Sequence, residues 1–407
     1  MNCRHCAARL DAPFLDLGSA PPSNAYLAED QLDAPETWFP LRLLVCHACW
    51  LVQTVDFASR EALFTSDYAY FSSFSQSWLD HSRRYVTEMI ARFGLDASSC
   101  VVEVAANDGY LLQYVCDAGI PTYGIEPTAS TAARARARGI EIVERFFGVE
   151  LGDALAAEGR SADLITANNV LAHVPDINDF VGGFARLLKP DGVATFEFPH
   201  LLEMVTRNQF DTAYHEHYSY LSLTAVERIF AANGLLVFDV QQLPTHGGSL
   251  RVFAQLMGGR RSVTPAVMAL LQIEEDAGIM KPAFYSSFQR TAEMVKDDLL
   301  GFLLDARRSG LKVGAYGAAA KGNTLLNFAG VRPDLLPYVV DLNPAKAGSY
   351  MPGSRIPIVT QERLQADRPD RILVLPWNLR DEVVSQLAYA REWGAQFVVA
   401  VPSLQFI

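Results

Sequence analysis

The sequence predicts an α/β protein built from three units, and three observations predict it. Two Cys-x-x-Cys pairs lie within the first fifty residues. Short apolar runs then alternate with segments of helical periodicity, a pattern typical of a parallel sheet covered by helices, and the strands expected in the second unit are 100–105, 122–126, 162–167 and 192–198. A charged, helical stretch over residues 265–310 separates two such regions of alternation. We therefore expect units over residues 1–66, 67–260 and 261–407.

The overall composition limits the classes of function. The chain has 407 residues, of which 50% are hydrophobic and 20% charged, enough for a sizeable core. The 34 Lys and Arg against 46 Asp and Glu give a net charge of −12, which argues against a general binder of nucleic acids or anionic membranes. Neither a signal peptide nor a run of about 18 apolar residues is present. We expect a cytoplasmic protein without a nucleic-acid or membrane partner, and we leave its oligomeric state open, a monomer included.

The first unit is marked by two cysteine knuckles, Cys3-x-x-Cys6 and Cys46-x-x-Cys49. Four thiolates suit tetrahedral zinc and leave no position open for a reactive water, so we expect a structural metal site. The alternatives are two unrelated thiol pairs or redox-active Cys-x-x-Cys motifs. The chain between the knuckles is longer than in a compact zinc ribbon, so we expect it to form a small subdomain.

The second unit opens with a predicted strand, tight turn and helix start, Val101-Val-Glu103-Val-Ala105-Ala-Asn107-Asp-Gly109. Small residues in such a turn let the backbone approach a nucleotide-like ligand at the carboxyl end of the strand. The spacing differs from the dinucleotide pattern G-x-G-x-x-G, because Glu103 and Ala105 stand where glycine is needed. The pattern E-x-A-x-N-x-G instead resembles motif I of class I methyltransferases that use S-adenosylmethionine. We therefore expect Glu103, Ala105, Asn107 and Gly109 to line a cofactor site.

Two further strand ends extend the predicted cofactor site. Glu126 follows the next strand about 20 residues on, where a carboxylate can accept hydrogen bonds from both ribose hydroxyls. Asn168 and Asn169 end the strand that, in class I methyltransferases, faces the methyl-donor sulfur. The alternative for Glu126 is a solvated strand end. Three landmarks in this order favour methyl transfer.

A histidine-rich segment, Tyr214-His215-Glu216-His217-Tyr218, carries the next chemistry. In an extended segment, Tyr214 and Glu216 would share one side and His217 the other, whereas in a turn they would converge differently. A carboxylate beside an imidazole can orient the ring and raise its basicity, so we expect an acid/base role. A metal site lacks the i, i+4 spacing of a zincin helix, and a purely structural polar cluster is the other alternative.

The third unit repeats the strand, small-residue turn and helix start. Gly317 and Gly322 have P-loop spacing, but Lys321 precedes the second glycine, so we do not expect ATP hydrolysis. Backbone N–H groups at a helix start suit a pyrophosphate, and we expect a nucleotide diphosphate beside Lys321. The alternative is a tight packing turn. The predicted substrate ligands, all near this turn or in the preceding Gly-Gly-Ser-Leu-Arg motif, are Arg251, Tyr316, Lys321, Asn323 and Asp341.

Together these motifs resemble the nucleotide-sugar C-methyltransferases of deoxysugar pathways, which include the TDP-hexose 3-C-methyltransferases of antibiotic sugar biosynthesis. The motifs span nearly the whole chain in family order: the knuckles, Glu-Val-Ala-x-Asn-Asp-Gly-Tyr-Leu, Asn-Val-Leu-Ala-His-Val-Pro-Asp, Tyr-His-Glu-His-Tyr-Ser-Tyr-Leu, His-Gly-Gly-Ser-Leu-Arg and Gly-Ala-Tyr-Gly-Ala-Ala-Ala-Lys-Gly-Asn. The resemblance implies a zinc-binding N-terminal domain, a central Rossmann-like domain for S-adenosylmethionine and a C-terminal Rossmann-like domain that helps to hold a nucleotide-diphosphate sugar.

The resemblance also implies a reaction site. The Tyr-His-Glu-His match points to Tyr214, Glu216 and His217 as catalytic residues, with His173 and Tyr70 lining the same site. On a 4-keto-6-deoxyhexose, His217 oriented by Glu216 would remove a proton next to the ketone, while Tyr214 or His173 would donate to the enolate oxygen. C-3 is the favoured methylation site. Methylation of C-5, or of oxygen or nitrogen in another small molecule, is the alternative, and the nucleotide base, the other sugar substituents and the stereochemistry stay open.

Overall fold

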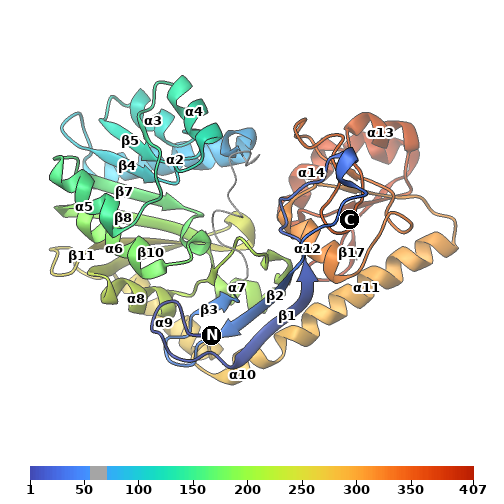
Figure 1. Ribbon diagram of the computed structural model, residues 1–407, viewed down its shortest axis with the longest axis horizontal. Helices are drawn as coiled ribbons and strands as arrows, with labels where there is room; N and C mark the ends of the chain where they lie inside the picture. Colours follow the sequence, from blue (N-terminus) through green and yellow to red (C-terminus); the bar gives the residue numbers. More distant parts are fainter. Residues whose placement is uncertain (56–70) are drawn as a thin grey trace.

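The protein forms three β-sheets, one for each predicted unit (Figure 1). The computed structural model describes residues 1–55 and 71–407, so the predicted boundary between residues 66 and 67 lies outside the described residues. The central and C-terminal units lie on opposite sides of the view, with the N-terminal strands at the lower centre, and the long helix α11 (Phe288–Arg308) runs along the lower side of the C-terminal unit. Among the described residues, no helix has both the length and the apolar character needed to cross a bilayer.

The N-terminal sheet is antiparallel and takes its last strand from the central unit. Its strands are β1 (Ala12–Ala20), β2 (Phe39–Val45), β3 (Val52–Thr54) and β9 (Ser219–Tyr220), and a short 3-10 helix, η1 (Glu29–Gln31), lies between β1 and β2. Burial alternates along β2, where Leu41 and Leu43 are buried and Arg42 is exposed and bonded to Asp16 across the pair, at 2.8 Å. Because β9 directly follows the histidine-rich segment in the chain, the cysteine-rich unit contacts the predicted reaction site.

The central sheet has seven strands in the order β10-β11-β8-β7-β4-β5-β6. They are β4 (Val101–Val104), β5 (Thr122–Ile125), β6 (Ile142–Val143), β7 (Ala162–Asn168), β8 (Leu188–Pro199), β10 (Leu235–Leu243) and β11 (Ser249–Leu256). Within this sheet β11 runs in the direction opposite to the other six strands. The chain reverses its direction of winding between β4 and β7, which makes their carboxyl ends a switch point for ligand binding. This doubly wound order confirms the predicted Rossmann-like central domain.

Helices cover both faces of the central sheet. The α-helices of this unit are α2 (Gln76–Phe93), α3 (Leu112–Asp117), α4 (Ala129–Ala137), α5 (Val149–Ala157), α6 (Ile177–Leu187), α7 (Leu201–Thr206) and α8 (Leu223–Ala232). Its 3-10 helices are η2 (Ser72–Phe74), η3 (Leu171–His173), η4 (Phe210–Thr212) and η5 (Thr245–Gly247). Strands β4, β5, β7 and β8 confirm four predicted strands, whereas β6, β10 and β11 were not predicted.

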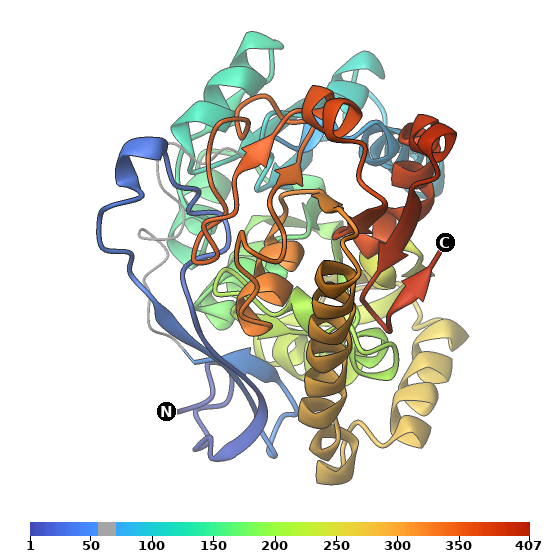
Figure 2. The ribbon, with the colours of Figure 1, turned by 90° about the vertical axis from the view of Figure 1, so that its right-hand side faces the viewer.

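The C-terminal sheet is a second Rossmann-like sheet, as predicted, with the order β14-β13-β12-β15-β16-β17 (Figure 2). Its strands are β12 (Val313–Tyr316), β13 (Val339–Val340), β14 (Ile358–Val359), β15 (Arg371–Val374), β16 (Gln396–Val399) and β17 (Gln405–Phe406). Its helices are α12 (Ala320–Phe328), α13 (Gln361–Asp367), η6 (Trp377–Leu379), α14 (Arg380–Gln386) and η7 (Ala388–Trp393). The predicted helical stretch is also confirmed, as α9 (Pro265–Ala277), α10 (Pro282–Ser286) and α11.

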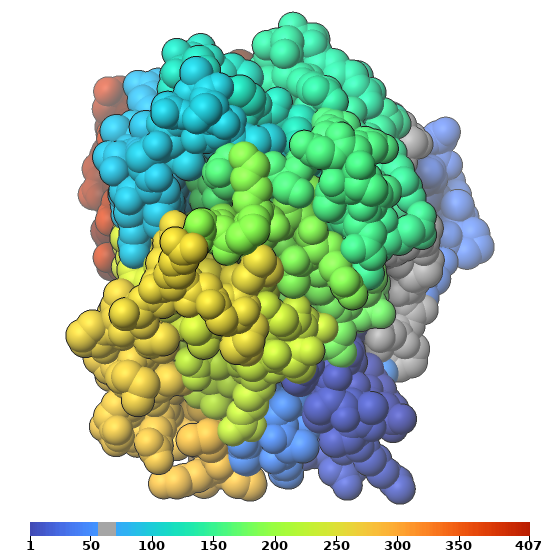
Figure 3. Space-filling model, turned by 90° about the vertical axis from the view of Figure 1, so that its left-hand side faces the viewer, coloured from blue at the N-terminus to red at the C-terminus, as the bar shows by residue number. Residues whose placement is uncertain are grey.

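The N-terminal unit shares its hydrophobic core with both other units. Cys3, Cys46 and Leu51 belong to the apolar cluster that fills the central sheet, while β1 packs on α11, where the rings of Phe14 and Phe288 stack 4.8 Å apart. On the face shown in Figure 3, the N-terminal residues adjoin the central unit and the α9–α10 region directly. The small unit is therefore held by its neighbours as well as by its cysteines.

Close packing of the cofactor-side strands predicts one stability effect. A Cβ on Gly124, in β5, would lie 2.6 Å from both Ala106 Cβ and Ile142 Cδ1. Gly124→Ala should therefore lower the free energy of unfolding by about 1–3 kcal/mol in urea titrations. The matched control is Gly301→Ala in α11, where a Cβ would meet nothing within 4 Å, and which should raise that free energy by up to about 1 kcal/mol. Equal stabilities of the two variants would contradict this packing.

Candidate active site

Four thiols form a closed cluster in the N-terminal unit. The sulfur atoms of Cys3, Cys6, Cys46 and Cys49 all lie within 4.8 Å of one another, and the pairs Cys3–Cys49 and Cys6–Cys46 are 3.5 Å apart. Sulfurs bound to one tetrahedral zinc ion stand about 3.8 Å apart, so the set fits a single Zn²⁺. Gln53 Nε2 also donates to Cys3 Sγ at 3.2 Å, as expected for a thiolate ligand. The donor set is complete without water, so the metal would have a structural role.

The turn after β4 has the backbone of a ligand cradle. Ala105, Asn107 and Gly109 all have positive φ angles, of 61°, 49° and 77°, and such strain in residues other than glycine gathers at functional sites. A Cβ on Gly109 would lie 2.4 Å from Ile140 Cδ1, so this position requires glycine. Glu103 lies fully buried below the turn, and burial raises its pKa well above the usual value.

Glu126 stands at the end of β5 and is tied to the same turn. Its Oε2 accepts a hydrogen bond from the Asn107 amide at 3.0 Å, and its Oε1 accepts one from the Thr128 amide at 2.8 Å. A carboxylate offers about four acceptor positions, so acceptor capacity remains for ribose hydroxyls. The turn and Glu126 therefore fit the predicted S-adenosylmethionine site.

Asn168 ends β7, and Asn169 follows it at the mouth of the site. Asn169 has a φ of 54°, its amide donates to the Glu197 carbonyl at 2.7 Å, and its Nδ2 donates to His246 Nε2 at 3.0 Å. Its Oδ1 is buried and finds no hydrogen-bond partner within residues 1–55 and 71–407, which leaves an acceptor for a ligand. No sequence pattern signals the contact between His246 and Asn169, because the two residues lie 77 positions apart in the chain.

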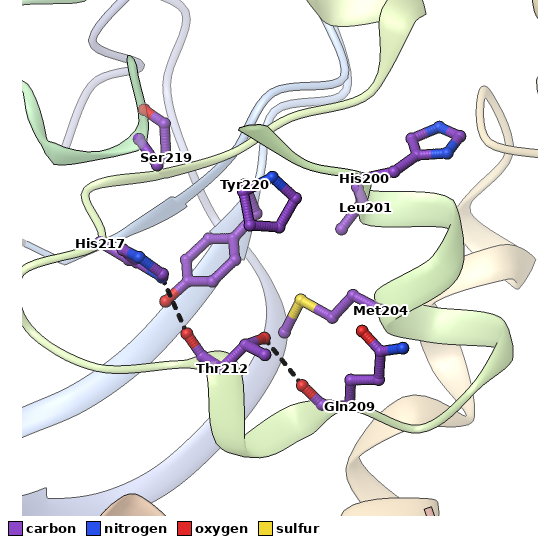
Figure 4. Close-up of a pocket in the computed structure, with 10 residues that line it drawn as sticks. His200, Leu201, Met204, Gln209, Thr212, His217, Ser219 and Tyr220 are labelled. Carbon is purple, nitrogen blue, oxygen red and sulfur yellow. Dashed lines mark hydrogen bonds between the residues drawn. The ribbon is translucent and has the colours of Figure 1, made fainter. Parts of the chain in front are cut away.

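Tyr214, His217 and His173 come together beside a largely apolar cavity. His217 Nδ1 donates to the Thr212 carbonyl at 2.9 Å (Figure 4), and Tyr214 Oη donates to His217 Nε2 at 2.6 Å. The rings of His173 and His217 meet edge to face, with centroids 4.6 Å apart. Thr212 therefore fixes the tautomer of His217, in which Nε2 carries the basic lone pair.

Burial keeps both imidazoles neutral. Apolar side chains such as Leu201 and Met204 line the cavity beside His217 (Figure 4). Loss of hydration lowers the pKa of His217 well below its usual value, and the nearby His173 lowers it further. Burial also lowers the pKa of His173 to about 4. Neutral His217 can accept a proton, and neutral His173 can still donate one in a hydrogen bond.

Glu216 does not orient His217, which corrects one expectation. The segment is a turn closed by a hydrogen bond from the His217 amide to the Tyr214 carbonyl, 2.9 Å long, so the two rings converge and Glu216 points away. Both carboxylate oxygens of Glu216 accept from Asn24 Nδ2, at 2.9 and 2.8 Å. Burial raises the pKa of Glu216 to about 7. Tyr70, the fifth predicted catalytic residue, lies outside the described residues.

Lys321 extends from α12 back to the central unit. Its Nζ lies 4.5 Å from the centre of the Trp377 ring and donates to Asn378 Oδ1 at 3.2 Å and to the His246 carbonyl at 3.4 Å. Burial lowers the pKa of Lys321 to about 8, although Asp211 opposes this shift. A buried ammonium held mainly by neutral groups is suited to an anionic ligand.

Three of the other predicted substrate ligands, Asn323, Asp341 and Tyr316, lie at or beside the start of α12. Asn323 is 1% exposed, and its amide finds no partner among the described residues. Asp341 Oδ2 accepts from the Ala318 amide at 2.8 Å, and Tyr316 Oη donates to Gln386 Oε1 at 2.7 Å, so both surround the β12–α12 turn.

Arg251 does not fit its predicted role as a diphosphate ligand. It is 3% exposed inside the central sheet, where Nη2 donates to Glu197 Oε2 at 2.9 Å and Nη1 to Gln241 Oε1 at 3.2 Å. The sequence left open whether Arg251 reaches a phosphate or pairs with an acid, and β11 carries the side chain into an internal ion pair with Glu197.

Comparison with family models covers most of the chain. Residues 3–64 match a model for a zinc binding domain, residues 78–240 a model for a methyltransferase domain, and residues 244–402 a model for a C-methyltransferase C-terminal domain. The C-methyltransferase NovU of Streptomyces niveus is 34% identical over 406 residues, which cover 100% of this chain and 96% of that protein.

More distant similarities cover only part of the chain. A ubiquinone biosynthesis O-methyltransferase of Chelativorans sp. (strain BNC1) is 24% identical over 158 residues, which cover 33% of this chain and 62% of that protein. Among solved structures, the 1,6-didemethyltoxoflavin-N1-methyltransferase of Burkholderia thailandensis is 17% identical, with a TM-score of 0.37, over 51% of this chain and 96% of that chain. A TM-score of this size does not establish a shared fold.

The thiol cluster predicts the metal content. Wild-type protein should contain one zinc ion per chain, and Cys46→Ser should lose most of it and lower Tm by roughly 10 °C, because a thiolate ligand is removed and metal binding contributes to folding. Metal analysis and thermal unfolding measure both. Cys116→Ser is the control, since Cys116 is exposed and lies outside the cluster. Full zinc content in Cys46→Ser would contradict a four-thiolate site.

The buried Glu216 predicts a pH-dependent stability. With a pKa of about 7 in the folded protein against 4.5 as its ordinary value, Glu216 keeps its proton longer when folded, so its contribution to stability falls as pH rises from about 4.5 through 7. Glu216→Gln removes this cost, at most about 3 kcal/mol, and keeps an acceptor for Asn24. Its Tm should exceed that of wild type by more at pH 8 than at pH 5.

A matched variant separates this effect from a general loss of charge. Glu275→Gln, on the exposed side of α9, should leave Tm unchanged at both pH values. The same difference from wild type at pH 5 and pH 8 for Glu216→Gln would show that Glu216 ionises normally in the folded protein.

Proposed function

This chain belongs to the family of S-adenosylmethionine-dependent C-methyltransferases, and we propose that it methylates a nucleotide-diphospho-4-keto-6-deoxyhexose on a carbon next to the ketone, with C-3 favoured. One observation carries the proposal. Tyr214 Oη lies 2.6 Å from Nε2 of a His217 ring whose tautomer is fixed by the Thr212 carbonyl. This arrangement combines a neutral base with a hydrogen-bond donor, the pair that formation of an enolate requires.

A carbon atom needs activation before it can accept a methyl group. A hydrogen next to a ketone is weakly acidic, and the negative charge left by its removal is stabilised when donors already point at the ketone oxygen. His217 Nε2 is the acceptor for this proton. Tyr214 Oη donates to the ketone oxygen in place of Nε2, and this exchange of partners frees the lone pair of His217.

His173, on a separate backbone segment, is a second hydrogen-bond donor that can stabilise the negative charge of the enolate. Its ring touches that of His217, and its pKa of about 4 keeps it neutral across the physiological range. A neutral imidazole donates a hydrogen bond without repelling the proton that His217 receives. Burial of the two rings strengthens each of these interactions, because charges and dipoles are screened less away from bulk water.

The predicted cofactor residues include Asn168 and Asn169, which precede His173 by five and four residues in the chain. S-adenosylmethionine supplies a methyl group bound to a positively charged sulfur. The predicted binding residues are those of the β4 turn and of the ends of β5 and β7, namely Glu103, Ala105, Asn107, Gly109, Glu126, Asn168 and Asn169. Methyl transfer itself needs mainly that the methyl donor and the accepting carbon are held in the correct relative position.

The nucleotide diphosphate is assigned to the start of α12. Lys321 supplies a buried positive charge, and Asn323 supplies an amide with unused hydrogen-bonding capacity. Unpaired backbone N–H groups at the helix start add to the attraction for phosphate. Tyr316 and Asp341 lie beside this turn. Arg251 is paired with Glu197 inside the central sheet and does not bind the diphosphate.

Methylation of oxygen or nitrogen is the second candidate, and C-5 of the same sugar the third. Transfer to oxygen or nitrogen needs no removal of a carbon-bound proton, so it would leave the Tyr214–His217 pair without a purpose. Exchange of an α-hydrogen with solvent therefore distinguishes methylation of carbon, at C-3 or C-5, from methylation of oxygen or nitrogen.

The proposed activity is tested with a panel of TDP-, CDP- and GDP-4-keto-6-deoxysugars and S-adenosylmethionine, with NMR of the products. We expect a new methyl carbon attached to C-3 of one of these sugars. A methyl group on C-5 would change the assigned position. A methyl group on oxygen or nitrogen without exchange of the α-hydrogen would overturn the proposal.

The base is tested in the same assay. His217→Asn should lower both deuterium exchange at the α-carbon and methylation at least about 100-fold, the usual minimum loss for a general base. His215→Asn is the matched control, because His215 lies in the same turn but its Nε2 contacts the Phe39 carbonyl in the N-terminal sheet. Undiminished exchange in His217→Asn would remove His217 from the mechanism.

A further inference from the structure

The first cysteine knuckle is connected to the catalytic turn through strand β3. The Arg4 amide, between the ligands Cys3 and Cys6, donates to Gln53 Oε1 at 3.0 Å, and Gln53 Nε2 donates to Cys3 Sγ at 3.2 Å. Gln53 is also paired with Ser219 of β9, two residues after His217. Strand β3 therefore lies directly between the metal ligands and the proposed base.

The Arg4 side chain joins three segments of the site. Its Nη1 donates to the Pro175 carbonyl at 2.8 Å, and its Nη2 donates to the Thr54 carbonyl at 3.0 Å. The guanidinium carbon also lies 5.2 Å from the centre of the Tyr218 ring. Pro175 follows His173 by two residues and Tyr218 follows His217 directly, so one side chain contacts the neighbourhoods of both imidazoles.

Thr54 completes the link to His217. Its Oγ1 donates to the His217 carbonyl, and its amide donates to the Tyr218 carbonyl at 3.1 Å. The Tyr218 amide in turn donates to the Ala172 carbonyl at 2.8 Å, next to His173. The two histidine segments are thus held together from the side of β3, and Arg4 bonds to the carbonyls at both ends of this arrangement.

We propose that Arg4 is a positioning residue for the reaction: by bridging the Thr54 and Pro175 carbonyls, it holds His217 against His173. The zinc knuckle that carries Arg4 would then help to align the proton-accepting group in addition to stabilising the fold. This inference rests on the proposed function only for the role of the two histidines. An arginine suits the task because its rigid, planar head presents donors in two directions at once, whereas a lysine is a single point charge.

The relative position of the two imidazole rings has a large effect on the reaction rate. The rings of His173 and His217 come from separate backbone segments and meet at 4.6 Å. A misplacement of about 1 Å costs on the order of 100-fold in rate, and loss of groups that orient a site's ligands commonly costs 10–100-fold. A residue that only attached the N-terminal unit would instead affect stability and zinc content.

The test uses the full-length, zinc-loaded protein and three variants. Arg4→Ala removes both donors, Arg4→Lys keeps the charge, and Arg9→Ala is the control, because Arg9 is an exposed residue of the same loop. Zinc content, the ring-nitrogen NMR signals of ¹⁵N-labelled histidines and the rate of α-deuterium exchange are measured for each. Single His→Asn variants assign the signals of His173 and His217.

We expect all three variants to keep one zinc ion per chain. In Arg4→Ala the signals of His173 and His217 should shift, and exchange should fall about 10–100-fold, with partial recovery in non-denaturing guanidinium. Arg4→Lys should lie in between, and Arg9→Ala should match wild type.

Two results would overturn the proposal. Unchanged histidine signals with zinc retained would show that Arg4 does not position the rings, and loss of activity in proportion to loss of zinc would reduce Arg4 to a part of the metal site. The NMR signals need no sugar substrate. If wild type exchanges no deuterium with any keto-sugar, the proposed function fails, while shifted signals would still show that Arg4 positions the two histidines.

Discussion

The pairing of β3 with β9 is the constraint on which the rest of the site depends. Ser219 and Tyr220 follow the Tyr214–His217 turn in the chain but complete the sheet of the cysteine-rich unit. This pairing fixes the backbone that leaves the turn. The His217 ring also donates to the Thr212 carbonyl, and the Tyr218 amide donates to the Ala172 carbonyl. The convergence of Tyr214 on His217 follows from these backbone restraints, and the zinc knuckle lies directly behind them.

Burial then determines the chemistry of the groups that the turn assembles. Burial makes charge costly, which lowers the pKa of the two histidines and raises that of Glu216. The site therefore contains neutral donors and acceptors at physiological pH, which suits proton transfer at carbon. Lys321 keeps a charge at the edge of the site, where the ring of Trp377 and neutral oxygen atoms surround it.

Local patterns predicted local structure well. Four central strands, the helical stretch and the four-thiol cluster were predicted because hydrophobic periodicity and ligand spacing need no knowledge of distant residues. Prediction of the contacts within the site would have required knowledge of distant residues. The expectation that Glu216 orients His217 came from their adjacency in the Tyr-His-Glu-His motif, which does not show which distant residue each side chain meets. The partner of Glu216, Asn24, is 192 residues away, and the partner of Arg251, Glu197, sits on an adjacent strand that pairs only in the folded sheet.

The two-residue strand β9 also has a consequence for the order of folding during synthesis. Both cysteine knuckles have left the ribosome long before Tyr220, so the metal can bind while the sheet beside it still has an open edge. Contacts between parts of the chain so far apart in sequence form late, because closing the intervening loop costs entropy. The N-terminal sheet therefore stays incomplete until β9 has been synthesised. Helix α11 covers its other face later still. Until then, its unpaired edge and apolar face are exposed to the other chains in the cell.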